Sequence, residues 1–289
     1  MSRWPIGMLA TFLLTGWSPA SPLNFLASRD GISIAQSLPY GEGPRRTLDV
    51  YRPAGAANAP VVVFFYGGSW QMGDKETYLF VAAALARHGY VTIVPDYRVY
   101  PEVRYPGFLE DGAHAVRWAK DNAARFGGDS KKLFVMGHSA GAHIAAMLAL
   151  DPRWLKAVDM VPGRDLSGLI GISGPYDFLP LHDETLKVIF GGADRPDTQP
   201  ISHVAPGAPP SLLMTGVDDD TVDPGNASRL AARLRAAGDA ATVETYPYVG
   251  HLTIMGAFAA PLRFLAPVLH DAEVFMSKTL QARHAAVTP

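Results

Sequence analysis

The chain has 289 residues, of which 48% are hydrophobic and 18% are charged, an ordinary composition for a globular protein. The formal net charge is -2 and no run of Lys or Arg occurs, which excludes the electrostatic footprint of a nucleic-acid-binding protein. Cysteine is absent, so disulfides, thiolate metal sites and a cysteine nucleophile are excluded together. Residues 29–289 are most simply read as one large domain.

The first 28 residues have two interpretations that stay open. Arg3 precedes a mostly apolar stretch from Ile6 to Leu14, and mostly small or polar residues, with Trp17 among them, follow as far as Ala20. This order is typical of a secretory signal and would place the protein in the periplasm or outside the cell. The alternative is an N-terminal helix that packs on the domain of a cytoplasmic protein. The apolar stretch is much shorter than the roughly 20 residues that span a bilayer, so we expect no stable membrane span.

Further along, short β-rich runs alternate with longer helical patterns. Several of the runs are unbroken series of Val, Ile, Leu and Phe, which is typical of strands buried on both faces. This alternation predicts an α/β fold with a mostly parallel central sheet and helices on both of its faces. We expect strands at 47–51, 61–65, 91–95, 133–136, 169–172, 212–215 and 243–246, and helices at 78–87, 107–124, 142–150 and 227–237, the last with Gly238 as its C-cap.

The stretch from Ser173 to Pro210 does not fit this alternation. It is rich in Gly, Pro and Asp around one candidate helix at 181–190. Long irregular segments in compact domains often form lids or binding loops. The stretch is therefore either a short cap over the active site or a surface excursion that does not contact substrate.

The strongest motif is G-x-S-x-G at Gly137-His138-Ser139-Ala140-Gly141, between a buried-strand pattern and a helix-forming run. A strand that turns sharply into a helix holds the serine at the tip of the turn, and the flanking glycines make room for it. The first turn of the helix adds free N–H groups and the positive end of its dipole, which favour an oxyanion. The motif predicts a nucleophile elbow centred on Ser139.

A second glycine motif, Tyr66-Gly67-Gly68-Ser69-Trp70, follows the strand expected at 61–65. Two adjacent glycines let the backbone approach a substrate closely. We expect the N–H of Gly68 or Ser69, with that of Ala140, to form an oxyanion hole. Lipases and esterases of the α/β-hydrolase fold carry an HGG-type motif at this position, so Tyr66 replaces the usual histidine. Since the donors are backbone groups, this replacement need not abolish function.

The candidate base is His251, which follows the last expected strand and gives the chain order Ser, acid, His. The acid should follow the strand expected at 212–215, where several aspartates stand close together. The segment 216–222 fits the G-x-x-D-x-x-V pattern of this fold with Asp219 as the acid, and Asp223 is the alternative. Asp219 would orient His251 and stabilise its protonated form.

With these motifs in order, the chain from about Tyr40 to Phe275 resembles the bacterial carboxylesterases of the α/β-hydrolase superfamily, in the group of feruloyl-esterase-like esterases and arylformamidases. Asp96-Tyr97-Arg98 looks like the turn that buttresses the active-site side of the sheet in those enzymes. The other motifs that carry the resemblance are Leu48-Asp49-Val50-Tyr51-Arg52-Pro53, Tyr100-Pro101-Glu102 and Phe126-Gly127-Gly128-Asp129.

The resemblance implies hydrolysis of a small-molecule carboxylic ester through an acyl-enzyme on Ser139, without a metal or organic cofactor. The acyl and alcohol groups and the oligomeric state are not fixed by the sequence. Residues that adjoin the motifs are candidates for the wall of the substrate pocket: Tyr66, Trp70, Tyr176, Phe178 and Leu252.

Two alternatives stay open. The elbow from Gly137 to His143 is similar to that of arylformamidases, and the same groups would cleave a formamide. The other alternative is a catalytically inactive α/β-hydrolase fold that binds a ligand or partner. Such a protein is expected to lose a triad or oxyanion-hole residue, whereas here only Tyr66 departs from the pattern.

Overall fold

The computed structural model describes residues 21–287. The signal-like segment that ends at Ala20 lies outside the described residues, so its two interpretations remain predictions. The first described helix, α1 (Ser21–Leu26), lies against α2 (Leu79–Arg87). The Asn24 side chain donates to the Glu76 carbonyl at 2.8 Å and accepts from the Phe80 N–H at 3.0 Å. Among residues 21–287, no helix has the length and apolar character needed to cross a membrane.

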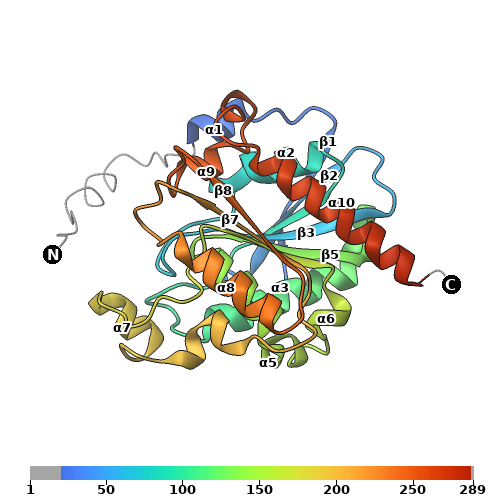
Figure 1. Cartoon of the computed structure of the whole chain (residues 1–289). Helices are drawn as coiled ribbons and strands as arrows, with labels where there is room; N and C mark the ends of the chain where they lie inside the picture. The colour runs from blue at the N-terminus through green and yellow to red at the C-terminus, as the bar shows by residue number, and fades with distance from the viewer. Residues whose placement is uncertain (1–20, 288–289) are drawn as a thin grey trace.

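The centre of the fold is an eight-stranded sheet with the order β1-β2-β4-β3-β5-β6-β7-β8 (Figure 1). The strands from β4 to β8 are parallel, and β2 pairs antiparallel with both β1 and β4. The predicted, mostly parallel sheet is therefore confirmed. The strands are β1 (Ile32–Pro39), β2 (Thr47–Pro53), β3 (Ala59–Phe65), β4 (Val91–Pro95), β5 (Gly128–His138), β6 (Gly168–Ile172), β7 (Ser211–Gly216) and β8 (Ala241–Tyr246).

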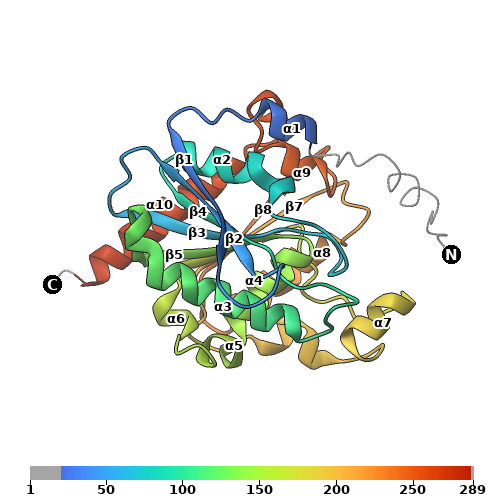
Figure 2. The same cartoon turned by 180° about the vertical axis from the view of Figure 1, so that it is seen from behind.

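Helices cover both faces of this sheet. α2 and α10 lie on one side of it and α3 and α8 on the other, as Figure 1 and, from behind, Figure 2 show. β3, β4 and β6 are almost fully buried between the two layers. Besides α1 and α2, the helices are α3 (Gly107–Asn122), α4 (Ala140–Leu150), α5 (Pro152–Lys156), α6 (Pro162–Asp165), α7 (Glu184–Phe190), α8 (Gly225–Ala236), α9 (Thr253–Gly256) and α10 (Val268–Val287).

Two large elements were absent from the sequence prediction. β1 is an edge strand with a register shift between Ala35 and Leu38, and its partly exposed residues give no continuous apolar run. α10 does carry a signal, because apolar residues recur three or four positions apart from Val268 through Ala272 to Met276. The helix was therefore predictable from periodicity.

The predicted cap stretch, residues 173–210, contains α7 and two short 3-10 turns. The helix expected at 181–190 begins three residues later, at Glu184. The reason is local: the Asp183 side chain accepts the Leu186 N–H at 2.8 Å and so caps the helix there. Gly191, at φ +73°, ends it.

Candidate active site

The nucleophile elbow joins β5 to α4 at Ser139. Its φ of +54° and ψ of -123° lie in a strained region for a side-chain-bearing residue. A Cβ on Gly137 would meet the Gly141 carbonyl oxygen at 2.2 Å, and a Cβ on Gly141 would meet the Phe65 carbonyl oxygen at 2.1 Å. Only glycine fits at these two positions, so the motif's spacing is a steric requirement of the turn.

Three side chains from three strand ends form a continuous hydrogen-bonded chain. The Ser139 Oγ lies 2.9 Å from His251 Nε2. On the other side of the ring, His251 Nδ1 lies 2.9 Å from Asp219 Oδ2 and 3.1 Å from Oδ1. The three residues follow β5, β8 and β7, whose carboxyl ends meet at one edge of the sheet. This is the geometry of a serine nucleophile, a base and an orienting acid.

The surroundings of Asp219 favour its ionised form. Burial alone would raise its pKa, but the hydrogen bonds that it accepts from His251 Nδ1 and from the Val222 N–H outweigh this effect, so the pKa lies below the usual value. Asp223 lies elsewhere: its exposed carboxylate accepts from Arg229 at 2.9 Å and from the Gly225 N–H at 2.9 Å. The structure thus brings Asp219, and not Asp223, to His251.

His138, inside the elbow, forms a hydrogen bond with the backbone of His251. Its Nε2 lies 3.0 Å from the His251 carbonyl oxygen, an acceptor, so Nε2 carries the proton. Burial, together with the nearby His251, lowers the pKa of His138 to about 3. A neutral His138 therefore holds the backbone of His251 and does not compete for the Ser139 proton.

The loop after β3 adopts a backbone that ordinary residues rarely take. Gly68 has φ +141°, and a Cβ there would meet the Met72 carbonyl oxygen at 2.1 Å. Ser69 and Trp70 follow at φ +52° and +59°. The loop lies against the nucleophile, because a Cβ on Gly67 would be 3.0 Å from the Ser139 Cβ.

The candidate oxyanion donors are free in this arrangement. Within residues 21–287, no hydrogen bond uses the N–H of Gly68, Ser69 or Ala140. Ala140 is the first residue of α4, where a helix leaves its N–H groups unpaired. These three N–H groups remain available to a developing negative charge.

The five predicted pocket residues separate into three groups. Tyr66 and Tyr176 are 0% and 1% exposed and belong to the core, so the prediction that they line the pocket is wrong. Adjacency to a motif says nothing about the direction in which a side chain points. Trp70 and the half-buried Phe178 stack on each other with ring centroids 5.8 Å apart. Leu252, beside His251, is 67% exposed.

His143, one helical turn after Ser139, was not predicted to have a role. Its Nε2 lies 2.8 Å from the Thr198 carbonyl oxygen, so it ties α4 to the stretch 173–210. Burial lowers the pKa of His143 to about 4. The rings of Trp70, Phe178 and Phe190 contact the imidazole edge to face, which makes one aromatic cluster from the loop after β3, α4 and the stretch 173–210.

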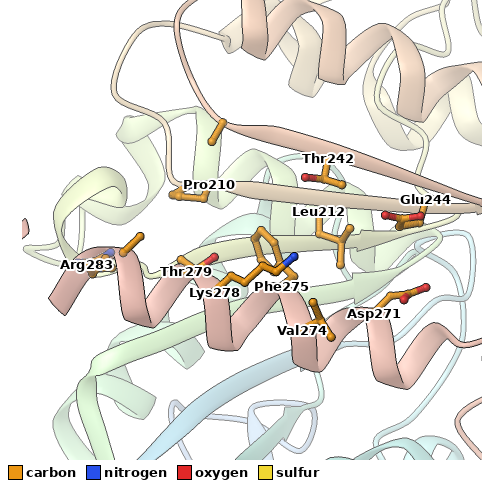
Figure 3. A pocket seen from close by; sticks show the side chains of 12 residues that line it. Pro210, Leu212, Thr242, Glu244, Asp271, Val274, Phe275, Lys278, Thr279 and Arg283 are labelled. Atoms are coloured by element: carbon orange, nitrogen blue, oxygen red, sulfur yellow. The ribbon is translucent and has the colours of Figure 1, made fainter. Parts of the chain in front are cut away.

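A groove of about 520 Å³ lies between α10 and the first residues of β7 and β8 (Figure 3). Pro210, Leu212 and Thr242 form one wall, and Val274 and Phe275 form the other. The triad residues follow the opposite, carboxyl ends of these strands, so the groove is separate from the active site. Over the described part of the chain, no three His, Asp or Glu side chains are placed to hold a metal ion.

Comparison with known proteins points to one family. The BD-FAE family model matches residues 48–234. The esterase LipC of Mycobacterium tuberculosis is 31% identical over 75% of this chain and 57% of its own length. A probable isoprenylcysteine alpha-carbonyl methylesterase of Oryza sativa, ICMEL1, is 34% identical over 64% of this chain and 45% of its own length. The chain thus spans about half the length of these curated relatives.

Solved structures show the same fold. A truncated carbohydrate esterase from gut microbiota superposes with a TM-score of 0.75 at 20% identity, covering 88% of this chain and 99% of that one. Esterase B of Lactobacillus rhamnosis, solved with a tributyrin phosphonate inhibitor, gives a TM-score of 0.76 at 19% identity over 90% of each chain. The predicted α/β-hydrolase fold and esterase group are confirmed, and because the family model covers well over half of the chain, the protein belongs to the BD-FAE family.

Proposed function

We propose that the protein hydrolyses carboxylic esters through an acyl-enzyme on Ser139. The observation that carries the proposal is the unbroken chain from the Ser139 Oγ through the His251 imidazole to the Asp219 carboxylate, with both contacts at 2.9 Å. Relatives named as esterases support an ester rather than a formamide as substrate. The complete triad also argues against a ligand-binding protein without activity.

In the first half of the reaction, His251 Nε2 takes the proton of the Ser139 hydroxyl while the Oγ attacks the ester carbonyl carbon. The carbonyl oxygen becomes an oxyanion, which the N–H groups of Gly68 or Ser69 and of Ala140 stabilise. The Asp219 carboxylate accepts the Nδ1–H and stabilises the imidazolium. When the C–O bond to the alcohol breaks, His251 gives its proton to the leaving oxygen, and the acyl group remains on Ser139.

In the second half, His251 takes a proton from a water molecule, whose oxygen attacks the acyl carbon. Collapse of this second tetrahedral intermediate breaks the bond to Ser139, and the Oγ recovers its proton from His251. We also propose that the stretch 173–210 acts as a cap, because Phe178 stacks on Trp70 of the oxyanion loop. The cap and the loop would then shape the acyl pocket together.

Covalent labelling with a fluorophosphonate tests the proposal directly. The wild-type protein should label and hydrolyse p-nitrophenyl acetate, whereas Ser139→Ala should do neither. Asp219→Ala should lose about 10⁴ in kcat, and Asp223→Ala should stay close to the wild type. A wild-type protein that neither labels nor turns over esters would refute the proposal, and a kcat/KM about 10³ higher for an N-formyl aromatic amine would make it a formamidase.

A further inference from the structure

The aromatic ring of Tyr66 is buried behind the oxyanion loop, and its hydroxyl is held by two charged groups. The hydroxyl donates to Asp96 Oδ1 at 2.8 Å and accepts from Arg45 Nη2 at 3.0 Å. No part of the side chain is exposed to solvent. The phenol therefore has a fixed position, set by an anion on one side and a cation on the other.

The same two charged residues also hold the far end of the loop. Arg45 Nη2 donates to the Gly73 carbonyl oxygen at 2.7 Å, and its Nε donates to the Tyr97 carbonyl oxygen at 2.9 Å. Asp96 Oδ1 accepts the Lys75 N–H at 2.9 Å. Both ends of the segment from Tyr66 to Lys75 are thus hydrogen-bonded to Arg45 and Asp96.

Close packing adds to these bonds. A Cβ on Gly73 would meet the Tyr66 ring at 2.8 Å, so the end of the loop lies directly on the phenol. The Tyr97 hydroxyl donates to the Tyr66 carbonyl oxygen at 2.7 Å, and the Tyr66 and Tyr97 rings stack at 4.7 Å. Tyr66, which leads into Gly67 and Gly68, is consequently held in place by both Gly73 and Tyr97.

Lys75 adds a second cation to this cluster. The Lys75 ammonium lies 3.6 Å from Asp96 Oδ2 and 3.6 Å from Asp49 Oδ1, and only 4% of its side chain is exposed. Burial raises the pKa of Asp96, while the Tyr66 hydrogen bond and the Lys75 charge oppose this effect. An anion in this place is stabilised only as long as its partners remain.

We propose that Tyr66, Asp96 and Arg45 form a positioning unit that sets the geometry of the oxyanion hole in place of the histidine usual at position 66. The inference rests on the proposed ester hydrolysis. None of the three side chains touches substrate; they act through the backbone from Gly67 to Gly73. Loosening them should weaken stabilisation of the oxyanion more than binding of the ground state, so kcat should fall while KM changes little.

The test compares Tyr66→Phe with Tyr51→Phe, measuring kcat and KM for an ester and for its thionoester. Sulfur accepts hydrogen bonds poorly, so the thionoester gains little from a well-aligned oxyanion hole. Tyr51 is the matched control, because it is also fully buried but its hydroxyl has no partner within residues 21–287. Tyr66→Phe should lower kcat for the ester by about tenfold, less than deletion of a donor, and lower the ester-to-thionoester ratio by about the same factor. Tyr51→Phe should leave this ratio unchanged.

An unchanged ester-to-thionoester ratio in Tyr66→Phe, whether or not kcat falls for both substrates, would overturn the positioning role. If Tyr66→Phe does not fold, Arg45→Met provides an independent readout. It removes the hydrogen bonds to Gly73 and to the phenol without changing Tyr66, and the same drop in the ester-to-thionoester ratio is expected. Failure of the proposed function has a different signature, because wild-type protein would then show no turnover that depends on Ser139.

Discussion

The proposed oxyanion loop, residues 66–75, and the proposed cap, residues 173–210, are both irregular segments, but they are held by different contacts. The loop is tied to two charged residues, the half-buried Arg45 and the buried Asp96. The buried anchors of the cap are neutral: the Asn226 amide oxygen accepts the Tyr176 N–H at 2.8 Å, and the neutral His143 ring donates to the Thr198 carbonyl oxygen. The ion pair between Arg229 and Asp177 of the cap lies at the exposed surface.

This difference matches what each segment contacts in the proposed reaction. The loop meets the charge that develops in the transition state, where a small displacement of a donor is costly. The cap meets the rest of the substrate, where contacts act in the ground state and the transition state alike. We therefore expect changes in the loop to lower kcat, and changes in the cap to alter substrate preference and stability.

Among changes in the loop and the cap, the largest effect should come from Gly68→Ala. The added Cβ would meet the Met72 carbonyl oxygen at 2.1 Å, and φ +141° disfavours any side chain, so the donor N–H groups must move. We expect kcat for p-nitrophenyl acetate to fall by about 10² to 10³ with little change in KM. Gly89→Ala is the matched control, because Gly89 has φ +97° but no atom within 4 Å of its Cβ position. That variant should be less stable but fully active.

Wild-type kcat in Gly68→Ala would mean that the loop supplies no oxyanion donor. Equal losses in Gly68→Ala and Gly89→Ala would mean that general backbone strain, rather than the position of the loop, lowers activity.

A second effect concerns stability: it tests whether His143, which anchors the cap to α4, is neutral in the folded protein. The pKa of His143 is about 4 in the folded protein, against roughly 6.5 when the chain is unfolded. As the pH falls below about 6.5, the unfolded chain takes up the proton first, so stability is lost until the pH reaches about 4. His143→Gln keeps a donor for the Thr198 carbonyl oxygen but does not titrate.

Urea unfolding at pH 7 and pH 5 measures this effect. The wild-type free energy of unfolding should drop between these values by about 2 kcal/mol more than that of His143→Gln. His114→Gln, at an exposed site on α3, should keep the wild-type pH dependence. The same drop in His143→Gln and in wild-type protein would contradict a buried, neutral His143.

The three residues that the structure places in contact have a sequence signal, and their supports do not, for a physical reason. A strand–turn–helix such as the one around Ser139 is a local structure, and its glycines are required by atoms within a few residues. The order Ser139, Asp219, His251 follows from the connection of the strands in this fold. The structure adds their contacts, at 2.9 Å each.

The supports are distant in sequence and have no local signature. Arg45 reaches Tyr66 across 21 residues and Gly73 across 28, and nothing around Arg45 marks it. Similarly, the contact of His143 with Thr198 spans 55 residues. The direction of the Tyr66 side chain depends on Asp96. Asp96 follows β4, which lies beside β3 in the sheet. Such partners become visible only when the strand order is known.

The smallest effect should come from Phe178→Ala, in the cap. Phe178 is half-buried and stacks on Trp70 at 5.8 Å, so its removal should enlarge the proposed acyl pocket without moving the oxyanion donors. A hydrophobic pocket discriminates by about 10-fold or more per methylene group. We expect the ratio of kcat/KM for p-nitrophenyl hexanoate over acetate to rise by about tenfold, while kcat for acetate changes by less than about threefold.

Phe275→Ala, in the groove beside α10, is the matched control and should keep the wild-type ratio. A loss of kcat for acetate as large as that expected for Gly68→Ala would show that the cap also sets the oxyanion hole, because the Trp70 stack would then transmit its position to the loop.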